Sequence, residues 1–158
     1  MHVPAILRDF PGAKIVCIVR DGRDNALSLN AMPWWHGTLP GAARLWARCA
    51  RLTAEFAARY PEHFRVARYE ALVARPEDAV RWVTTWLGET FESTQLDPSI
   101  PSAVVLPRSV SWKAAALRFI YAGQADRRRR GATARQIARI EAIIAPELRL
   151  HGYGPFAG

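Results

Sequence analysis

The sequence predicts an α/β fold in which a small parallel sheet is flanked by helices. Residues Lys14–Val19 (KIVCIV) form a short apolar run rich in β-branched residues, which is typical of a strand buried on both faces. Residues Phe64–Tyr69 (FRVARY) alternate apolar and polar side chains, which indicates a second strand. Helical patterns lie between and after these segments, and strands joined through helices favour parallel pairing.

The first strand follows a turn signal at Phe10–Gly12 and leads directly into a helix expected over residues 22–31. Asp21 is the expected N-cap of this helix. Asp24, three residues later, can supply the reciprocal carboxylate of a capping box. A buried strand that runs straight into a helix is half of a βαβ unit.

A long helix is expected over residues 41–60, with Pro61 ending it. Its apolar stripe is predicted to consist of Leu45, Cys49, Leu52 and Phe56. The two cysteines, Cys17 and Cys49, show no metal-ligand spacing. Since both fall on apolar segments, we expect them to be buried thiols.

After the second strand, Pro76 is expected to open a helix that ends at Gly88. Residues 90–111 are rich in Pro and Ser, which predicts an irregular loop. A last helix is expected over residues 134–144, with Pro146 following it. Two or three strands make an unusually small sheet, so we expect a sheet incomplete on its amino-terminal side, within a single partial domain over residues 1–158.

The composition favours a folded chain with an anionic partner. Half of the 158 residues are hydrophobic and 23% are charged, and no apolar run reaches the length of a membrane span. With no basic-then-apolar signal peptide, we expect a cytoplasmic protein. The net charge of +8 is carried almost entirely by arginine, which suits phosphate groups. Charge alone does not choose among a nucleotide, a nucleic acid and a membrane surface.

The segment from Arg20 to Ser28 (RDGRDNALS) is the sharpest chemical feature. Arg20 stands at the carboxyl end of a buried strand, where open α/β sheets bind their ligands. Ser28 lies along the following helix, on the side that carries Asp24. A guanidinium and a hydroxyl placed in this way can bind one phosphate. Alternatively, Arg20 pairs with Asp21 or Asp24, and Ser28 is only a small residue at a packed helix face.

The stretch FPGAKIVCIVRDGRDNALSL resembles the 3'-phosphate-binding signature of sulfotransferases that use 3'-phosphoadenosine 5'-phosphosulfate (PAPS). In that family a strand ends in Arg and a Ser follows eight positions later, as Arg20 and Ser28 do. The resemblance implies that these two residues bind the 3'-phosphate of PAPS or of adenosine 3',5'-bisphosphate. It also implies a P-loop NTPase-like arrangement of the sheet, with no metal.

Two later blocks are similar to the same family. Residues Arg68–Glu77 (RYEALVARPE) resemble its "RYEDL…P" segment, which implies that Tyr69 contacts the adenine. The alternative for Tyr69 is an amphipathic ring that caps the core. Glu70 is expected to be structural, bonding nearby backbone or Arg68. The segment Ala132–Gly152, with Pro146, Leu148 and Gly152-Tyr153, is similar to the family's terminal "L…Q…IE…AP…LGY" helix and tail.

Before that terminal block, family members carry basic residues and a glycine that clamp the 3'-phosphate. The run Asp126–Gly131 (DRRRRG) stands at this place, and the resemblance implies this role for Arg129, Arg130 and Gly131. The family's tryptophan is absent, so the register stays open. The alternative is a solvated basic loop.

No stretch resembles the family's amino-terminal "PKSGTT" or "RSGTT" loop, which holds the 5'-phosphosulfate through backbone N–H groups. We therefore expect a truncated chain, or one whose amino-terminal segment is missing. His2-Val3-Pro4 resembles the end of a "THLP"-like segment, which makes His2 the candidate general base, although so short a match can arise by chance. The other histidines, His36, His63 and His151, are expected at the surface.

The resemblance implies sulfuryl transfer from PAPS to a hydroxyl or amine of a small-molecule or glycan acceptor. We expect residues 30–40, with Trp34 and Trp35, and the loop 90–111 to shape the acceptor pocket. The alternative for these aromatic residues is a role in the core. The alternative function is a non-catalytic remnant that binds a nucleotide or another protein, or forms a homodimer that supplies the lost elements. RNA or membrane binding through Arg127–Arg130 is a third hypothesis, and no nucleic-acid partner is expected because the motifs of RNA-binding modules are absent.

Overall fold

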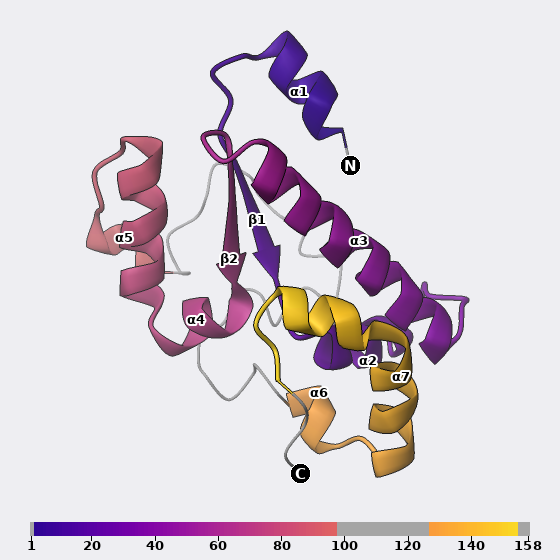
Figure 1. The fold of residues 1–158 in the computed structure, drawn as a ribbon. Helices are drawn as coiled ribbons and strands as arrows, with labels where there is room; N and C mark the ends of the chain where they lie inside the picture. Colours follow the sequence, from indigo (N-terminus) through magenta and orange to yellow (C-terminus); the bar gives the residue numbers. More distant parts are fainter. Residues whose placement is uncertain (1, 98–126, 155–158) are drawn as a thin grey trace. The chain divides into compact units, whose positions relative to one another are not determined.

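The computed structural model describes residues 2–97 and 127–154 (Figure 1). The chain divides into two compact units, Met1–Glu70 with Gly123–Gly158, and Ala71–Ala122. The described part of the first unit contains β1 (Ile15–Val19), β2 (Phe64–Arg68), α1 (Val3–Asp9), α2 (Gly22–Asn30), α3 (Leu39–Arg59), α6 (Arg127–Arg130) and α7 (Ala134–Leu150). Helix α4 (Tyr69–Ala74) begins in the first unit, and the second unit carries α5 (Pro76–Leu87) and the 3-10 helix η1 (Ser93–Leu96).

The two strands β1 and β2 pair in parallel, with Ile15 opposite Phe64 and Val19 opposite Arg68. The chain leaves β1, forms α2 and α3, and returns to β2, which completes a βαβ crossover. The predicted mixed α/β class, with a small parallel sheet flanked by helices, is confirmed. Because parallel strands end at the same edge, the residues that follow β1 and β2 come together there.

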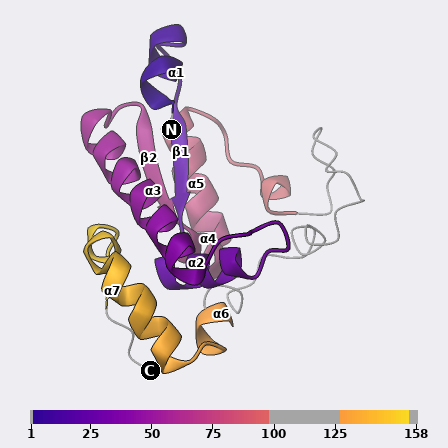
Figure 2. The same cartoon turned by 90° about the vertical axis from the view of Figure 1, so that its right-hand side faces the viewer.

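The prediction that the first strand is buried on both faces is wrong. Cys17 and Val19 lie on one face of β1, and the Sγ of Cys17 is 3.5 Å from the Oγ1 of Thr53 on α3. Ile18 points to the opposite face because side chains alternate along a strand, and it is 56% exposed. Figure 2 shows α3 running alongside the two strands and α7 packed near α2.

The core of the first unit lies among β1, α2, α3 and α7. The predicted stripe of α3 does not form its buried face, since Leu45 is 44% exposed and Cys49 is exposed as well. The buried residues of α3 are Ala42, Ala43, Trp46, Ala47, Ala50 and Thr53. Small alanines let Ile140 and Ile144 of α7 approach closely, and both isoleucines are almost fully buried. The expectation of a buried thiol is therefore wrong for Cys49, while Cys17 is partly buried.

The start of α2 differs in one respect from the prediction. Asp21 is the N-cap, as predicted, and its side chain accepts a hydrogen bond from the backbone N–H of Arg23. Asp24 does not close a capping box. Instead the backbone N–H of Asp21 donates to the carboxylate of Glu70, at 2.9 Å.

The other helix ends mostly follow the sequence signals. Helix α3 ends just before Pro61, α5 begins at Pro76, and Gly88 ends α5 with a φ of 85°. The predicted end of the last helix is wrong, because α7 continues through Pro146 to Leu150. A proline inside a helix removes one N–H donor and its ring crowds the carbonyl four residues earlier, and the burial of Glu147 and Leu148 beyond Pro146 offsets this cost.

Three short helices, α1, α4 and α6, were not indicated by the sequence pattern. The described part of the predicted irregular segment, residues 90–97, contains η1, and residues 98–111 lie outside the described residues. Whether the two units make the single domain predicted from the sequence stays a prediction. In the described parts of the chain, the helices are too short or too polar to cross a membrane.

Candidate functional site

The carboxyl ends of β1 and β2 bring two predicted site residues together. Arg20 directly follows β1, and Tyr69 directly follows β2. The guanidinium carbon of Arg20 lies 4.9 Å from the centre of the Tyr69 ring, within the range of a cation–π contact. A cation and an aromatic face thus lie side by side at the edge of the sheet where α/β proteins bind ligands.

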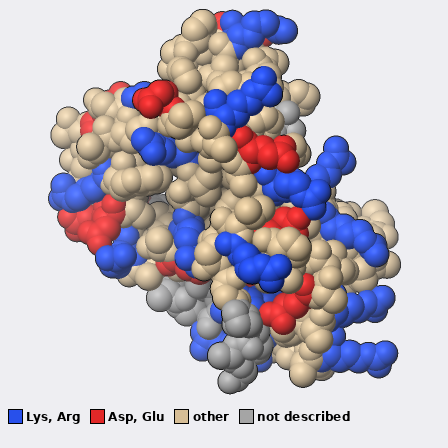
Figure 3. All heavy atoms as spheres, viewed as in Figure 1, with Lys and Arg blue, Asp and Glu red and all other residues tan. Residues whose placement is uncertain are grey.

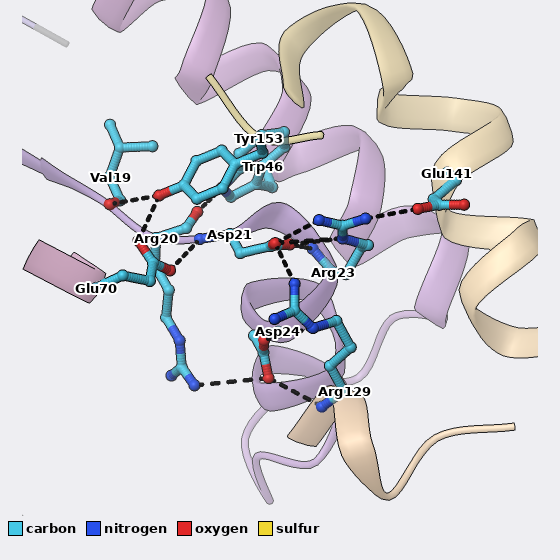
Figure 4. Close-up of polar contacts among 10 residues, drawn as sticks. All are labelled: Val19, Arg20, Asp21, Arg23, Asp24, Trp46, Glu70, Arg129, Glu141 and Tyr153. Carbon is cyan, nitrogen blue, oxygen red and sulfur yellow. Dashed lines mark hydrogen bonds and ion pairs between the residues drawn. The ribbon is translucent and has the colours of Figure 1, made fainter. Parts of the chain in front are cut away.

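Arg20 also pairs with Asp24 on the first turns of α2 (Figure 4). Its Nη2 lies 3.7 Å from the Oδ1 of Asp24, and the side chain of Arg20 is 21% exposed while that of Asp24 is fully buried. One of the two alternatives for Arg20, the pairing with Asp24, is therefore present. It is compatible with phosphate binding, because a guanidinium carries five N–H donors and reaches solvent here.

Asp24 has a second arginine beside it. The backbone N–H of Arg129 donates to Asp24 Oδ1 at 2.9 Å, and the Nε of Arg129 lies 3.7 Å from Oδ2. Burial raises the pKa of Asp24 and outweighs the opposite effects of this hydrogen bond and of the charges of Arg20 and Arg129. The carboxylate thus brings together two arginines that the sequence assigned to the site from separate blocks.

Asp21 forms the most buried ion pair of the site, with Arg23, and both side chains are 3% exposed. Arg23 donates to both carboxylate oxygens of Asp21 and to Glu141 on α7, and Arg129 donates to Asp21 at 2.5 Å. Burial acts to raise the pKa of Asp21, but hydrogen bonds from Arg23 and the charges of Arg23 and Arg129 hold it below its ordinary value. These contacts tie α2 to α6 and α7.

Glu70 joins the ends of the two strands. Its Oε1 accepts from the backbone N–H of Asp21, and its Oε2 lies 2.7 Å from the hydroxyl of Tyr153, which follows α7. The hydroxyl is also 3.2 Å from the carbonyl oxygen of Val19. Burial, followed by the interactions with Glu70, raises the pKa of Tyr153. The structural role expected for Glu70 is confirmed, although the backbone that it bonds is 49 residues away in the sequence.

The remaining predicted phosphate-binding residues lie at the margins of this cluster. Ser28 is partly buried in the last turn of α2, one helical turn after Asp24, so it projects from the same side of the helix. Arg130 and Gly131 are exposed at the end of α6, which packs against α2. The structure thus places Ser28 and the end of α6 on the helix that carries the charged cluster.

His2 lies away from this cluster. It is exposed at the N-cap of α1, where its side chain forms no capping hydrogen bond. Helix α1 precedes β1 and lies at the end of the strand opposite to α2 (Figure 1). The structure therefore does not bring His2 together with Arg20.

Two of the other histidines were expected at the surface and are not surface residues. His63 and His151 are partly buried, and their ring nitrogens bond the carbonyl oxygens of Ala13 and Ala50 at 3.0 and 2.9 Å. The expectation is therefore wrong for both rings, which hold backbone segments in place. His36 is exposed, as expected.

The residues expected to line an acceptor pocket divide between surface and core. Trp34 is 51% exposed, whereas Trp35 packs against the hydrophobic core of the first unit. The second expected element of the pocket lies mostly in residues 98–111, outside the described residues.

A comparison with protein families settles the class of the chain. Residues 1–93 match the model of the sulfotransferase family, which is more than half of the 158 residues. The chain belongs to the sulfotransferase family. Among curated proteins, none matches the chain. The matched range of this sulfotransferase-family chain contains Arg20, Ser28 and Tyr69, while Arg129 lies beyond it and is linked to the site by its contacts with two aspartates.

Two supporting residues of this sulfotransferase-family site were missed in the sequence. Trp46 donates from Nε1 to the carbonyl oxygen of Arg20 at 3.1 Å, and its only signal was its place among the alanines of α3. Tyr153 stood in the terminal block, but its partner Val19 is 134 residues away, so spacing could not connect them.

Proposed function

We propose that the chain binds the adenosine 3',5'-bisphosphate part of PAPS at the carboxyl edge of the β1–β2 sheet. Arg20, with Ser28, binds the 3'-phosphate, and the ring of Tyr69 lies against the adenine. The observation that carries the proposal is the contact of Arg20 with Tyr69, since it joins a phosphate-binding group and a base-stacking group at one edge. Membership of the sulfotransferase family supports it.

Arg129 supplies a second cation, and Arg130 and Gly131 provide further donors beside it. Asp21 and Asp24 hold Arg129 next to α2, so its guanidinium is oriented before a ligand arrives. Preorganised donors of this kind lose less conformational entropy on binding than mobile ones. Arginine also matches phosphate oxygens in a two-pronged geometry that lysine lacks.

The reaction proposed for the complete site is sulfuryl transfer to a hydroxyl or amine of a small-molecule or glycan acceptor. The bond between sulfur and the 5'-phosphate oxygen breaks, a bond from sulfur to the acceptor atom forms, and adenosine 3',5'-bisphosphate leaves. The proton of the acceptor passes to a general base. His2 receives no role in this proposal, because it lies at the other end of β1. The P-loop NTPase-like arrangement belongs to the same proposal.

Binding must be separated from general attraction to a cationic chain. Figure 3 shows Lys and Arg side chains scattered among acidic and other residues over the face in view, and the net charge is +8. An anion can therefore be attracted without entering the site. Arg48 is exposed on α3 and serves as a matched control, since its replacement removes the same charge elsewhere.

The test is calorimetric titration with adenosine 3',5'-bisphosphate and with 5'-AMP. We expect the wild-type chain to prefer the bisphosphate, and Arg20→Ala to lower this preference by about 10-fold or more, as for loss of a charged hydrogen bond. Arg48→Ala should leave the preference unchanged. Equal affinities for the two nucleotides, or an equal loss in Arg48→Ala, would contradict the proposal. A transfer assay with labelled PAPS then shows whether binding is accompanied by turnover.

A further inference from the structure

We propose that Glu70 and Tyr153 are positioning residues, which form a polar clamp that fixes the backbone of Arg20 for phosphate binding. The proposal rests on the proposed function, because it assigns a role to residues that support the same nucleotide site. It makes the segment that follows α7 a part of that site. Neither residue is assigned a contact with the nucleotide.

Side chains hold the backbone on both sides of Arg20. The carbonyl oxygen of Val19 lies 3.2 Å from the Tyr153 hydroxyl, and the N–H of Asp21 donates to Glu70 at 2.9 Å. Tyr153 and Glu70 are themselves joined at 2.7 Å. The two residues that flank Arg20 are therefore attached to one connected pair of side chains (Figure 4).

The carbonyl oxygen of Arg20 itself accepts a hydrogen bond from the indole N–H of Trp46 on α3 at 3.1 Å. Polar backbone groups of three successive residues, Val19, Arg20 and Asp21, are thus bonded by side chains from distant parts of the sequence. A buried backbone group held in this way has little freedom to rotate. The direction in which the Arg20 side chain leaves the main chain is accordingly set by the clamp and by Trp46.

Packing and the turn after α7 bring Tyr153 to the clamp. Tyr153 is 5% exposed, and the guanidinium carbon of Arg68 lies 4.3 Å from the centre of its ring. Gly152 adopts a φ of 72°, and the N–H of Tyr153 bonds back to the carbonyl oxygen of Leu148, so the end of α7 turns the ring toward β1. The packing of the ring therefore fixes the position of the Tyr153 hydroxyl.

The clamp is also connected to Tyr69, the proposed adenine contact. Glu70 directly follows Tyr69, just as Asp21 directly follows Arg20. The bond between Glu70 and Asp21 therefore joins the residues next to both proposed ligand-binding side chains. A change in this bond should alter the distance between the phosphate-binding and adenine-binding groups, beyond any effect on folding. A displacement of about 1 Å is enough to change the energetics of a preorganised site many-fold.

The experiment measures the preference for adenosine 3',5'-bisphosphate over 5'-AMP in Glu70→Ala, Glu70→Gln and Tyr153→Phe. We expect roughly a tenfold loss of preference in Glu70→Ala and Tyr153→Phe. Glu70→Gln keeps an amide oxygen for the Asp21 N–H, so it should lose less. Ile137→Val is the matched control, because it removes one buried methyl group from α7 without touching the clamp. Amide hydrogen exchange at Asp21 reports directly on the bond to Glu70.

The outcomes separate the clamp from the nucleotide site itself. A wild-type chain with no preference overturns the proposed function, and the clamp role with it. A wild-type preference that survives in folded Glu70→Gln and Tyr153→Phe at full strength overturns the clamp alone. So does an equal loss in Ile137→Val, which would assign the effect to general stability. If Glu70→Ala does not fold, Glu70→Gln and Tyr153→Phe still decide.

Discussion

Replacement of Asp21 should destabilise the chain more than replacement of an exposed acidic residue. Asp21→Ala removes the N-cap of α2 and takes its most buried carboxylate partner from Arg23, whose side chain is 3% exposed and still pairs with Glu141. Loss of a cap costs about 1 kcal/mol, and loss of one partner of a buried pair costs about 3–5 kcal/mol. The expected cost of about 4–6 kcal/mol is a large share of the roughly 5–15 kcal/mol by which small domains are stable.

Asp21→Asn separates the two contributions. The asparagine oxygen can still cap α2, whereas the negative charge is lost, so this variant should be about 1 kcal/mol more stable than Asp21→Ala. Urea unfolding followed by circular dichroism measures both differences. Asp78→Asn is the control, since Asp78 is paired with Arg75 at the surface, where ion pairs contribute about 0–1 kcal/mol.

The pH dependence supplies an independent check. The folded state holds the pKa of Asp21 below its ordinary value of 3.8, so the folded state binds fewer protons than the unfolded state in the window just below 3.8. The stabilisation by ionised Asp21 is therefore complete above that window and is lost as the pH falls through the folded pKa. The difference in free energy of unfolding between the wild type and Asp21→Asn should therefore decrease as the pH falls below 3.8. A gap below 1 kcal/mol at pH 7, or one that does not narrow in acid, refutes this reasoning.

Further predictions concern packing and charge. Gly22→Ala should cost about 1–3 kcal/mol in urea unfolding, because its Cβ would lie 2.6 Å from the Cδ1 of Ile144, whereas Gly12→Ala meets no atom within 4 Å and should be neutral. Ile144→Ala removes a fully buried side chain and should cost about 2–5 kcal/mol, so a loss below 1 kcal/mol would argue against the α3–α7 core. Asp24→Asn removes the carboxylate charge that holds Arg129 beside α2 and should weaken binding of adenosine 3',5'-bisphosphate in calorimetry by about tenfold; unchanged or tighter binding would argue against a preoriented Arg129.

The strands and main helices could be predicted because their signals are local. The β-branched run of β1 and the alternation of β2 fix strand type, and Pro76 and Gly88 mark the ends of α5. The buried face of α3 could not be predicted in this way. Its alanines carry a weaker apolar signal than Leu45, but their small side chains allow close helix contact.

The part of the candidate site that has local sequence signals was predictable. Arg20 and Tyr69 each follow a strand, so parallel pairing was enough to bring them together. The contacts that hold them were not predictable, because they join residues far apart in the sequence. Arg23 and Glu141 are 118 residues apart, and no spacing rule connects an arginine at the start of one helix with a carboxylate on another.

The central claim is that Arg20 binds the 3'-phosphate, and phosphorus NMR tests it most directly. Adenosine 3',5'-bisphosphate has two resolvable phosphorus nuclei, so the spectrum reports which phosphate meets the protein. We predict that the 3'-phosphorus resonance shifts more than the 5' resonance on titration with the wild-type chain, and that Arg20→Ala abolishes this difference while Arg48→Ala retains it. Equal shifts of both resonances in the wild type, or a 3' shift that persists in Arg20→Ala, would contradict the claim.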